Sequence, residues 1–142
     1  MTVHRVVFDT STLVSAALRP ESISNHALLR AMSLCDLCAS QATLDELKEV
    51  LTREKFRLYL ADAARQEFLR RVENNARLFV VREEDCLSVD PACRDPKDNK
   101  LPAVAAESEA EVLVSSDEDL LVLDPWNGVR IVRPAEFLSL IG

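Results

Sequence analysis

The most constraining feature of the sequence is a short apolar run near its start that stops at a carboxylate. Residues 6–8 read Val-Val-Phe without a polar break, and Asp9, Thr10 and Ser11 follow at once. Such a run is typical of a strand buried on both faces, as in the centre of a parallel sheet. In open α/β folds, ligands bind beyond the carboxyl ends of the strands. The first residues therefore predict that Asp9 lies at the mouth of an active site.

Length and composition favour a single globular domain. The chain has 142 residues, of which 48% are hydrophobic and 29% charged, and a domain of this size buries about two-thirds of its unfolded surface. No apolar run approaches the roughly 20 residues that a membrane-spanning helix needs, and the start lacks a basic segment followed by an apolar one. We expect one domain over residues 1–142 in a soluble, cytoplasmic protein with no membrane partner.

The net charge narrows the classes of function. A formal charge of −7 argues against a nucleic-acid binder whose affinity comes from an overall basic surface. It is compatible with a nucleic-acid enzyme, because clustered carboxylates that hold a divalent cation can approach phosphate through the metal.

The four cysteines do not predict a metal site. Cys35 and Cys38 are three positions apart on a predicted strand, so they point to opposite faces, and no histidine lies at zinc-finger spacing from them or from Cys86 and Cys93. Buried free thiols are the expectation.

Strand and helix patterns alternate along the chain. After the first strand, strands are predicted over residues 34–39, 78–81, 112–114 and 129–132. Helices are predicted over 13–18, 22–32, 40–51, 62–75 and 116–121, from about 97 to 109, and from Pro134 to 140; a polar loop spans 83–97. This order is typical of an α/β protein with a mostly parallel, five-stranded sheet.

Acidic residues recur where these strands end. Asp9 follows the first strand, Asp117 the fourth, and Asp98 the loop after the third, while Glu46 borders the apolar stripe of the helix after the second. Capping offers a structural explanation for most of them: Asp95 suits a helix N-terminus, and the pairs Thr43/Glu46 and Ser116/Asp119 have capping-box spacing.

Asp9 is the exception, because it is expected at a strand end rather than in a helix cap. Carboxylates held close together repel each other unless a cation compensates them. A hard divalent ion, Mg²⁺ or Mn²⁺, fits a site made of oxygen ligands.

Four segments, in this order and spacing, resemble the PIN-domain nucleases, and more closely the toxin components of bacterial toxin–antitoxin systems. They are VVFDTSTLVSA, LDELKEVL followed by TREKF, CRDPKDNKLPAVA, and AEVLVSSDEDLL. The resemblance extends from Arg5 to about Leu123. It implies a three-layer α/β/α fold around a central parallel sheet, ribonuclease activity dependent on Mg²⁺ or Mn²⁺, a small antitoxin partner, and a homodimer.

The resemblance also assigns roles to residues. The catalytic acids are Asp9, Glu46, Asp98 and Asp117, with Asp119 at a frequent additional acidic position and Ser115 at a frequent hydroxyl. The hypothesis is that Asp9, Asp98 and Asp117 hold the metal for hydrolysis of RNA, and that Glu46 completes its coordination or orients the attacking water. Hydroxyls of Thr10, Ser11 and Ser115 would hold the carboxylates. Candidates for phosphate contacts are Arg94, Lys97, Lys100, Arg53, Lys55 and Arg57. For Arg53, Lys55 and Arg57, a solvated helix face explains the basic residues equally well.

The chain departs from the family pattern at two positions. Ser11 replaces the usual asparagine, and Pro102 stands where a helix former is usual. Two other interpretations stay open. One is a PIN-like binding module without activity. The other is an enzyme that transfers a phosphoryl group to a strand-end aspartate, as in haloacid-dehalogenase-like phosphatases or receiver domains. The phosphatases of this kind usually carry a second aspartate at the position of Ser11.

Overall fold

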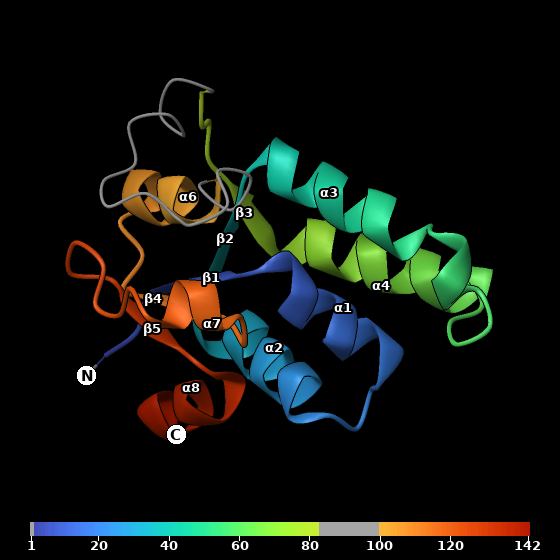
Figure 1. The fold of residues 1–142 in the computed structure, drawn as a ribbon, viewed down its shortest axis with the longest axis horizontal. Coiled ribbons are helices and arrows are strands. Elements are labelled where there is room, and N and C mark those ends of the chain that lie inside the picture. The colour runs from blue at the N-terminus through green and yellow to red at the C-terminus, as the bar shows by residue number, and fades with distance from the viewer. Residues whose placement is uncertain (1, 83–99) are drawn as a thin grey trace.

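The centre of the computed structural model is a parallel sheet between two layers of helices (Figure 1). The structure describes residues 2–82 and 100–142. Within these residues the sheet has five strands in the order β3-β2-β1-β4-β5, all parallel. They are β1 (Arg5–Phe8), β2 (Asp36–Ala39), β3 (Ala76–Leu78), β4 (Val112–Val114) and β5 (Arg130–Val132). The predicted α/β fold class is therefore confirmed.

The two faces of the sheet bury alternate residues of each strand. Val6 and Phe8 of β1 belong to one hydrophobic cluster, and Val7 between them belongs to the other. In the first cluster the ring of Phe8 packs edge-on against Phe137, with centroids 5.8 Å apart. Side chains of a strand alternate between its faces, so a strand covered on both sides must be apolar throughout. The uninterrupted run at residues 6–8 follows from this requirement.

The helices divide between the two faces. The first cluster packs under α1 (Thr10–Leu18), α2 (Ile23–Leu34), α3 (Gln41–Leu51), α4 (Asp62–Asn75) and α8 (Pro134–Ile141). The second packs under α6 (Lys100–Ser108) and α7 (Glu118–Leu121). A short 3₁₀ helix, η1 (Glu54–Phe56), lies between α3 and α4. As predicted, Pro134 occupies the first turn of α8.

Several predicted boundaries and caps are wrong. α3 is capped by Ser40, whose reciprocal partner is Thr43, so Glu46 takes no part in a capping box. α7 is capped by Asp117 rather than Ser116. The third strand lies at residues 76–78 instead of 78–81, because Ala76 pairs in register with Leu37 of β2. At this sheet edge backbone pairing, not apolar burial, sets the strand.

The structure also shows the surroundings of Cys35, Cys38 and Pro102. Cys35 and Cys38 are free and contact opposite hydrophobic clusters, although Cys35 is only partly buried. Pro102 lies in the first turn of α6 as described, from Lys100 onward, and is buried there. None of the described helices is long and apolar enough to cross a membrane.

The strand order places a topological switch beside β1. The chain moves from β1 to β2 and β3 on one side, then crosses to β4 and β5 on the other. At such a switch the connections leave the neighbouring strands in opposite directions, which opens a crevice at their carboxyl ends. β1 and β4 flank the switch here, and Asp9 and Ser115 are the residues that directly follow them. The crevice between these two residues is the expected place for a site.

Candidate active site

Asp9 is the single residue between β1 and α1, and it has a structural task that the sequence argument did not assign. Its side chain caps α1 by accepting a hydrogen bond from the Thr12 N–H, with Oδ1 2.8 Å from the nitrogen. The expectation that Asp9 lies outside a helix cap is therefore wrong. Its own N–H donates to the Val114 carbonyl, 3.0 Å away, and extends the pairing of β1 with β4 by one residue. Both contacts fix the carboxylate over the switch point.

The hydroxyl of Ser115 connects Asp9 with Asp117. Ser115 is fully buried, its hydroxyl donates to Oδ2 of Asp9, and its oxygen accepts the Asp117 N–H at 2.9 Å. The Asp117 carboxylate in turn caps α7 through the Asp119 N–H, 2.9 Å away. Residues more than a hundred positions apart thus orient one another by a continuous hydrogen-bond path.

Asp9 is buried, with only 3% of its surface exposed. Burial raises the pKa of its carboxyl group, while hydrogen bonds from Ser115, Thr12 and Ser11 act in the opposite direction without cancelling the effect. The Ser11 hydroxyl is one of these donors, 3.3 Å from Oδ2. A buried carboxylate with a raised pKa is typical of a functional site, where the structure accepts the cost of holding a charge.

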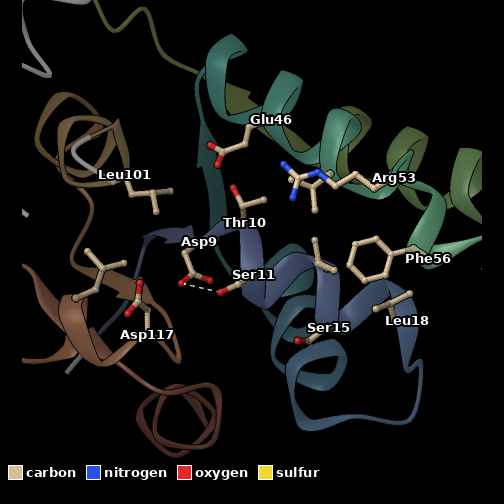
Figure 2. A pocket seen from close by; sticks show the side chains of 13 residues that line it. Asp9, Thr10, Ser11, Ser15, Leu18, Glu46, Arg53, Phe56, Leu101 and Asp117 are labelled. Carbon is tan, nitrogen blue, oxygen red and sulfur yellow. Dashed lines mark hydrogen bonds between the residues drawn. The ribbon is translucent and has the colours of Figure 1, made fainter. Parts of the chain in front are cut away.

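A pocket of about 520 Å³ opens in front of Asp9 (Figure 2). Asp117 lies on the side of α7, Glu46 points in from α3, and Thr10 and Ser11 come from the first turn of α1. Three of the four predicted acids therefore share one pocket. Apolar walls from Val14, Leu18, Val50, Phe56, Leu101 and Leu120 line the rest, together with Ser15 and Arg53.

Glu46 is paired with a cation at the pocket. Lys100 Nζ lies 2.7 Å from its Oε2, and each side chain keeps about a third of its surface exposed. The pair links α3 to α6, which cover opposite faces of the sheet. Lys100, which is predicted to contact phosphate, balances the charge of a predicted catalytic acid in this structure.

The other predicted phosphate contacts lie in different surroundings. Arg53 reaches the pocket but forms a two-point hydrogen bond with Glu49, at 2.9 and 3.2 Å. Lys55 lies outside the pocket, with Nζ 5.0 Å from the centroid of the Phe56 ring. The predicted site residues Asp98, Arg94 and Lys97 fall outside the described residues.

The described donors suit a hard cation in kind. Asp9, Asp117 and Glu46 offer carboxylate oxygens, whereas no histidine or cysteine among the described residues lines the pocket. Mg²⁺ and Mn²⁺ prefer such oxygen ligands. Within residues 2–82 and 100–142, no three acidic, histidine or cysteine side chains are close enough together to hold a metal ion.

Sequence reasoning missed two residues of this region. Thr12 is 2% exposed, and its hydroxyl oxygen has no hydrogen-bond partner among the described residues. Its backbone role could have been found by reading Asp9 as a cap, since an N-cap side chain accepts from the third residue of the helix. The other missed residue is Phe56, which forms part of the pocket wall. The sequence feature that could have indicated it is a lone aromatic residue between the basic residues Lys55 and Arg57.

Comparisons with known proteins agree with this fold. The family model described as PIN domain matches residues 5–119. No curated protein matches the chain in sequence. Among solved structures, PAE2754 from Pyrobaculum aerophilum is 22% identical, with a TM-score of 0.63 over 99% of this chain and 90% of that one. VapBC2 from Rickettsia felis, bound to a DNA fragment from its promoter, is 12% identical, with a TM-score of 0.65 over 89% and 96%. VapC20 from Mycobacterium tuberculosis, a toxin that cleaves the sarcin-ricin loop, is 15% identical, with a TM-score of 0.57 over 88% and 98%.

Proposed function

Since the chain belongs to the PIN domain family, we propose that it is a metal-dependent endoribonuclease and the toxin of a toxin–antitoxin pair. The single observation that carries the proposal is the convergence of Asp9, Asp117 and Glu46 on one pocket at the switch point of the sheet. Capping explains why Asp9 and Asp117 are acidic, but it does not explain why both carboxylates face the same cavity. A shared cation does, because it removes their mutual repulsion.

Asp9, Asp117 and Asp98 would hold Mg²⁺ or Mn²⁺, with Asp98 as the contribution of the segment that follows β3. When bound, the cation supplies charge neutralisation at the scissile phosphate and acidifies a water for in-line attack. The roles of the protein groups follow from their contacts. Ser115 and Ser11 donate to Asp9 and keep its oxygens aimed at the pocket, as hydroxyls around metal ligands commonly do.

Glu46 is the candidate for orienting the attacking water. It lines the same pocket as the two aspartates, and Lys100 holds it at 2.7 Å. In the RNA complex, Lys100 is placed to exchange this carboxylate for a phosphate of the substrate, which would free Glu46 for the water. Thr10 lines the same pocket from the start of α1, and the Asp119 N–H keeps the Asp117 carboxylate in place.

The toxin part of the proposal is supported by the solved structures that share the fold. One of them is named VapBC2, and another, VapC20, is named as a toxin that cleaves the sarcin-ricin loop. We infer a small antitoxin as partner for this chain, and a homodimer as its assembly. Size-exclusion chromatography of the chain alone, and then with the protein encoded beside it, tests both.

The test of the enzymatic proposal is cleavage of a single-stranded RNA by purified protein with Mn²⁺. Wild type should cleave, and both EDTA and the Asp9→Asn substitution should abolish cleavage. Asparagine also caps helices well, so circular dichroism should show an intact fold. Asp45→Asn is the matched control, because Asp45 is an exposed acid on α3 outside the pocket. If wild type binds RNA without cleaving any, the chain is a binding module instead.

A further inference from the structure

An aromatic and basic turn forms one rim of the pocket. Residues 53–57 read Arg-Glu-Lys-Phe-Arg, and Leu58 and Tyr59 follow. Three basic residues against one acidic residue give this turn a net charge of +2, in a chain whose total is −7. A local reversal of sign beside a pocket attracts polyanions to that rim despite the charge of the whole protein.

The turn touches the candidate active site directly. Arg53 and Phe56 both line the pocket that contains Asp9 and Asp117. Figure 2 shows the Phe56 ring between Arg53 and Leu18, across the pocket from Asp117. Lys55 holds its ammonium 5.0 Å from the centroid of the same ring, a cation–π arrangement.

Tyr59 is exposed although the turn around it is anchored. The N–H groups of Tyr59 and Leu60 both donate to the Phe56 carbonyl at 3.0 Å, and Leu60 is only 9% exposed. Tyr59 nevertheless keeps 73% of its surface in solvent. A large amphipathic ring presented by a hydrogen-bonded turn is a surface for contact with another molecule.

We propose that Phe56 and Tyr59, flanked by Lys55 and Arg57, form a platform that holds an unpaired nucleotide of the RNA next to the cleavage site. The platform rests on the proposed ribonuclease function and specifies its substrate as single-stranded at this position. Aromatic rings stack on the faces of bases, which are accessible only in unpaired segments. The two flanking cations match the phosphates on either side of the stacked base. Leu58 beside Tyr59 is also exposed, at 91%, but a protein partner is the weaker occupant because Lys55 and Arg57 on either side of Phe56 favour a polyanion.

The experiment measures binding of a fluorescent single-stranded RNA octamer to the Asp9→Asn protein in EDTA, so that cleavage does not interfere. A second octamer keeps the phosphates but carries abasic positions in its centre. The protein should prefer the intact octamer, and Tyr59→Ala should weaken its binding by about fivefold or more. It should leave binding of the abasic octamer unchanged. Tyr59→Phe should retain the preference, since the ring and not its hydroxyl stacks.

Leu34→Ala is the matched control, because Leu34 is an exposed apolar residue just before the amino end of β2, away from the pocket. Added to the Asp9→Asn protein, which is the parent for these variants, it should leave the binding of both octamers unchanged. The proposal is overturned if the parent does not distinguish the octamers, if no RNA binds, or if Tyr59→Ala changes only association with a protein partner. Tyr59-dependent binding without any cleavage by wild type would overturn the enzymatic proposal and leave the platform standing. Asp9-dependent cleavage without an effect of Tyr59→Ala on RNA binding would overturn the platform and leave the enzymatic proposal standing.

Discussion

The Ser115 hydroxyl donates a hydrogen bond to Oδ2 of Asp9 across 106 positions of the chain. Both residues follow central strands that pair in parallel register, Phe8 with Val114. The contact is therefore a direct product of the sheet topology. It joins the segment that carries Asp9 to the segment that carries Asp117.

Removal of this hydroxyl should impair the site more than the fold. Ser115→Ala leaves Oδ2 of the buried Asp9 with one donor fewer and the Asp117 N–H without its acceptor. Loss of such a supporting contact typically lowers metal affinity or activity by about 10- to 100-fold, and unfolding should become easier by about 1–3 kcal/mol. Cleavage rates and urea denaturation measure the two effects.

Ser108→Ala is the control for this substitution. Ser108 is as buried as Ser115, but it lies at the end of α6 and does not line the pocket. Its loss should leave cleavage unchanged. Equal losses of activity in both variants would mean that Ser115 acts through general stability and not through Asp9.

Asp9→Asn should stabilise the protein when no divalent cation is present. Burial raises the pKa of Asp9 above its ordinary value of 3.8, so the ionised form lowers the stability of the folded state at neutral pH. The neutral amide avoids this cost, and we expect a gain of about 1 kcal/mol at pH 7. The gain should disappear as pH falls through the raised pKa towards 3.8, where wild-type Asp9 is itself protonated in the folded state.

Urea denaturation in EDTA between pH 4 and pH 8 measures this difference. Asp45→Asn, which removes an exposed charge from α3, should stay within about 0.5 kcal/mol of wild type throughout. A less stable Asp9→Asn protein at pH 7 would show that the ionised carboxylate stabilises the fold, contrary to the account.

Lys100 should compete with the metal for the charge of Glu46. Lys100→Met removes the ammonium that lies 2.7 Å from Oε2, so the pocket becomes more negative and should bind Mn²⁺ more tightly, by up to about fivefold for a partly exposed pair. The change in affinity is measured by titrating Mn²⁺ into the protein and following the electron paramagnetic resonance signal of the free ion. Lys48→Met removes the same charge from the exposed side of α3, and an equal shift in this variant would argue against a specific role for Lys100.

The fold could be predicted from sequence because its core strands are apolar on both faces. The run at residues 6–8 and the segment 112–114 are almost fully buried, so each had to be uniformly hydrophobic. The third strand was misplaced for the opposite reason: at the sheet edge Leu78 and Val80 are 52% and 83% exposed, and hydrophobicity there does not report burial. Backbone pairing with β2 sets its position.

Three of the four predicted acids line one pocket, whereas Asp98 lies outside the described residues, and the contacts between the acids were not predicted. The ends of neighbouring parallel strands meet, which sufficed to bring Asp9 and Asp117 to one pocket. The cap function of Asp9 was missed because strand and helix share a junction at this single residue, and propensity rules treat the two elements separately. The pairing of Glu46 with Lys100 depends on how α3 and α6 pack from opposite faces of the sheet, and no local pattern encodes that distance.

The most direct test of the central claim is the rate of RNA cleavage as a function of Mn²⁺ concentration, for wild type and Asp117→Asn. If the carboxylates of this pocket hold the cation, wild type shows no cleavage without metal and saturates as Mn²⁺ rises. Asp117→Asn should then need at least tenfold more Mn²⁺ to reach half its maximal rate. Cleavage that persists in EDTA, or the same half-saturating Mn²⁺ concentration in both proteins, would contradict the account.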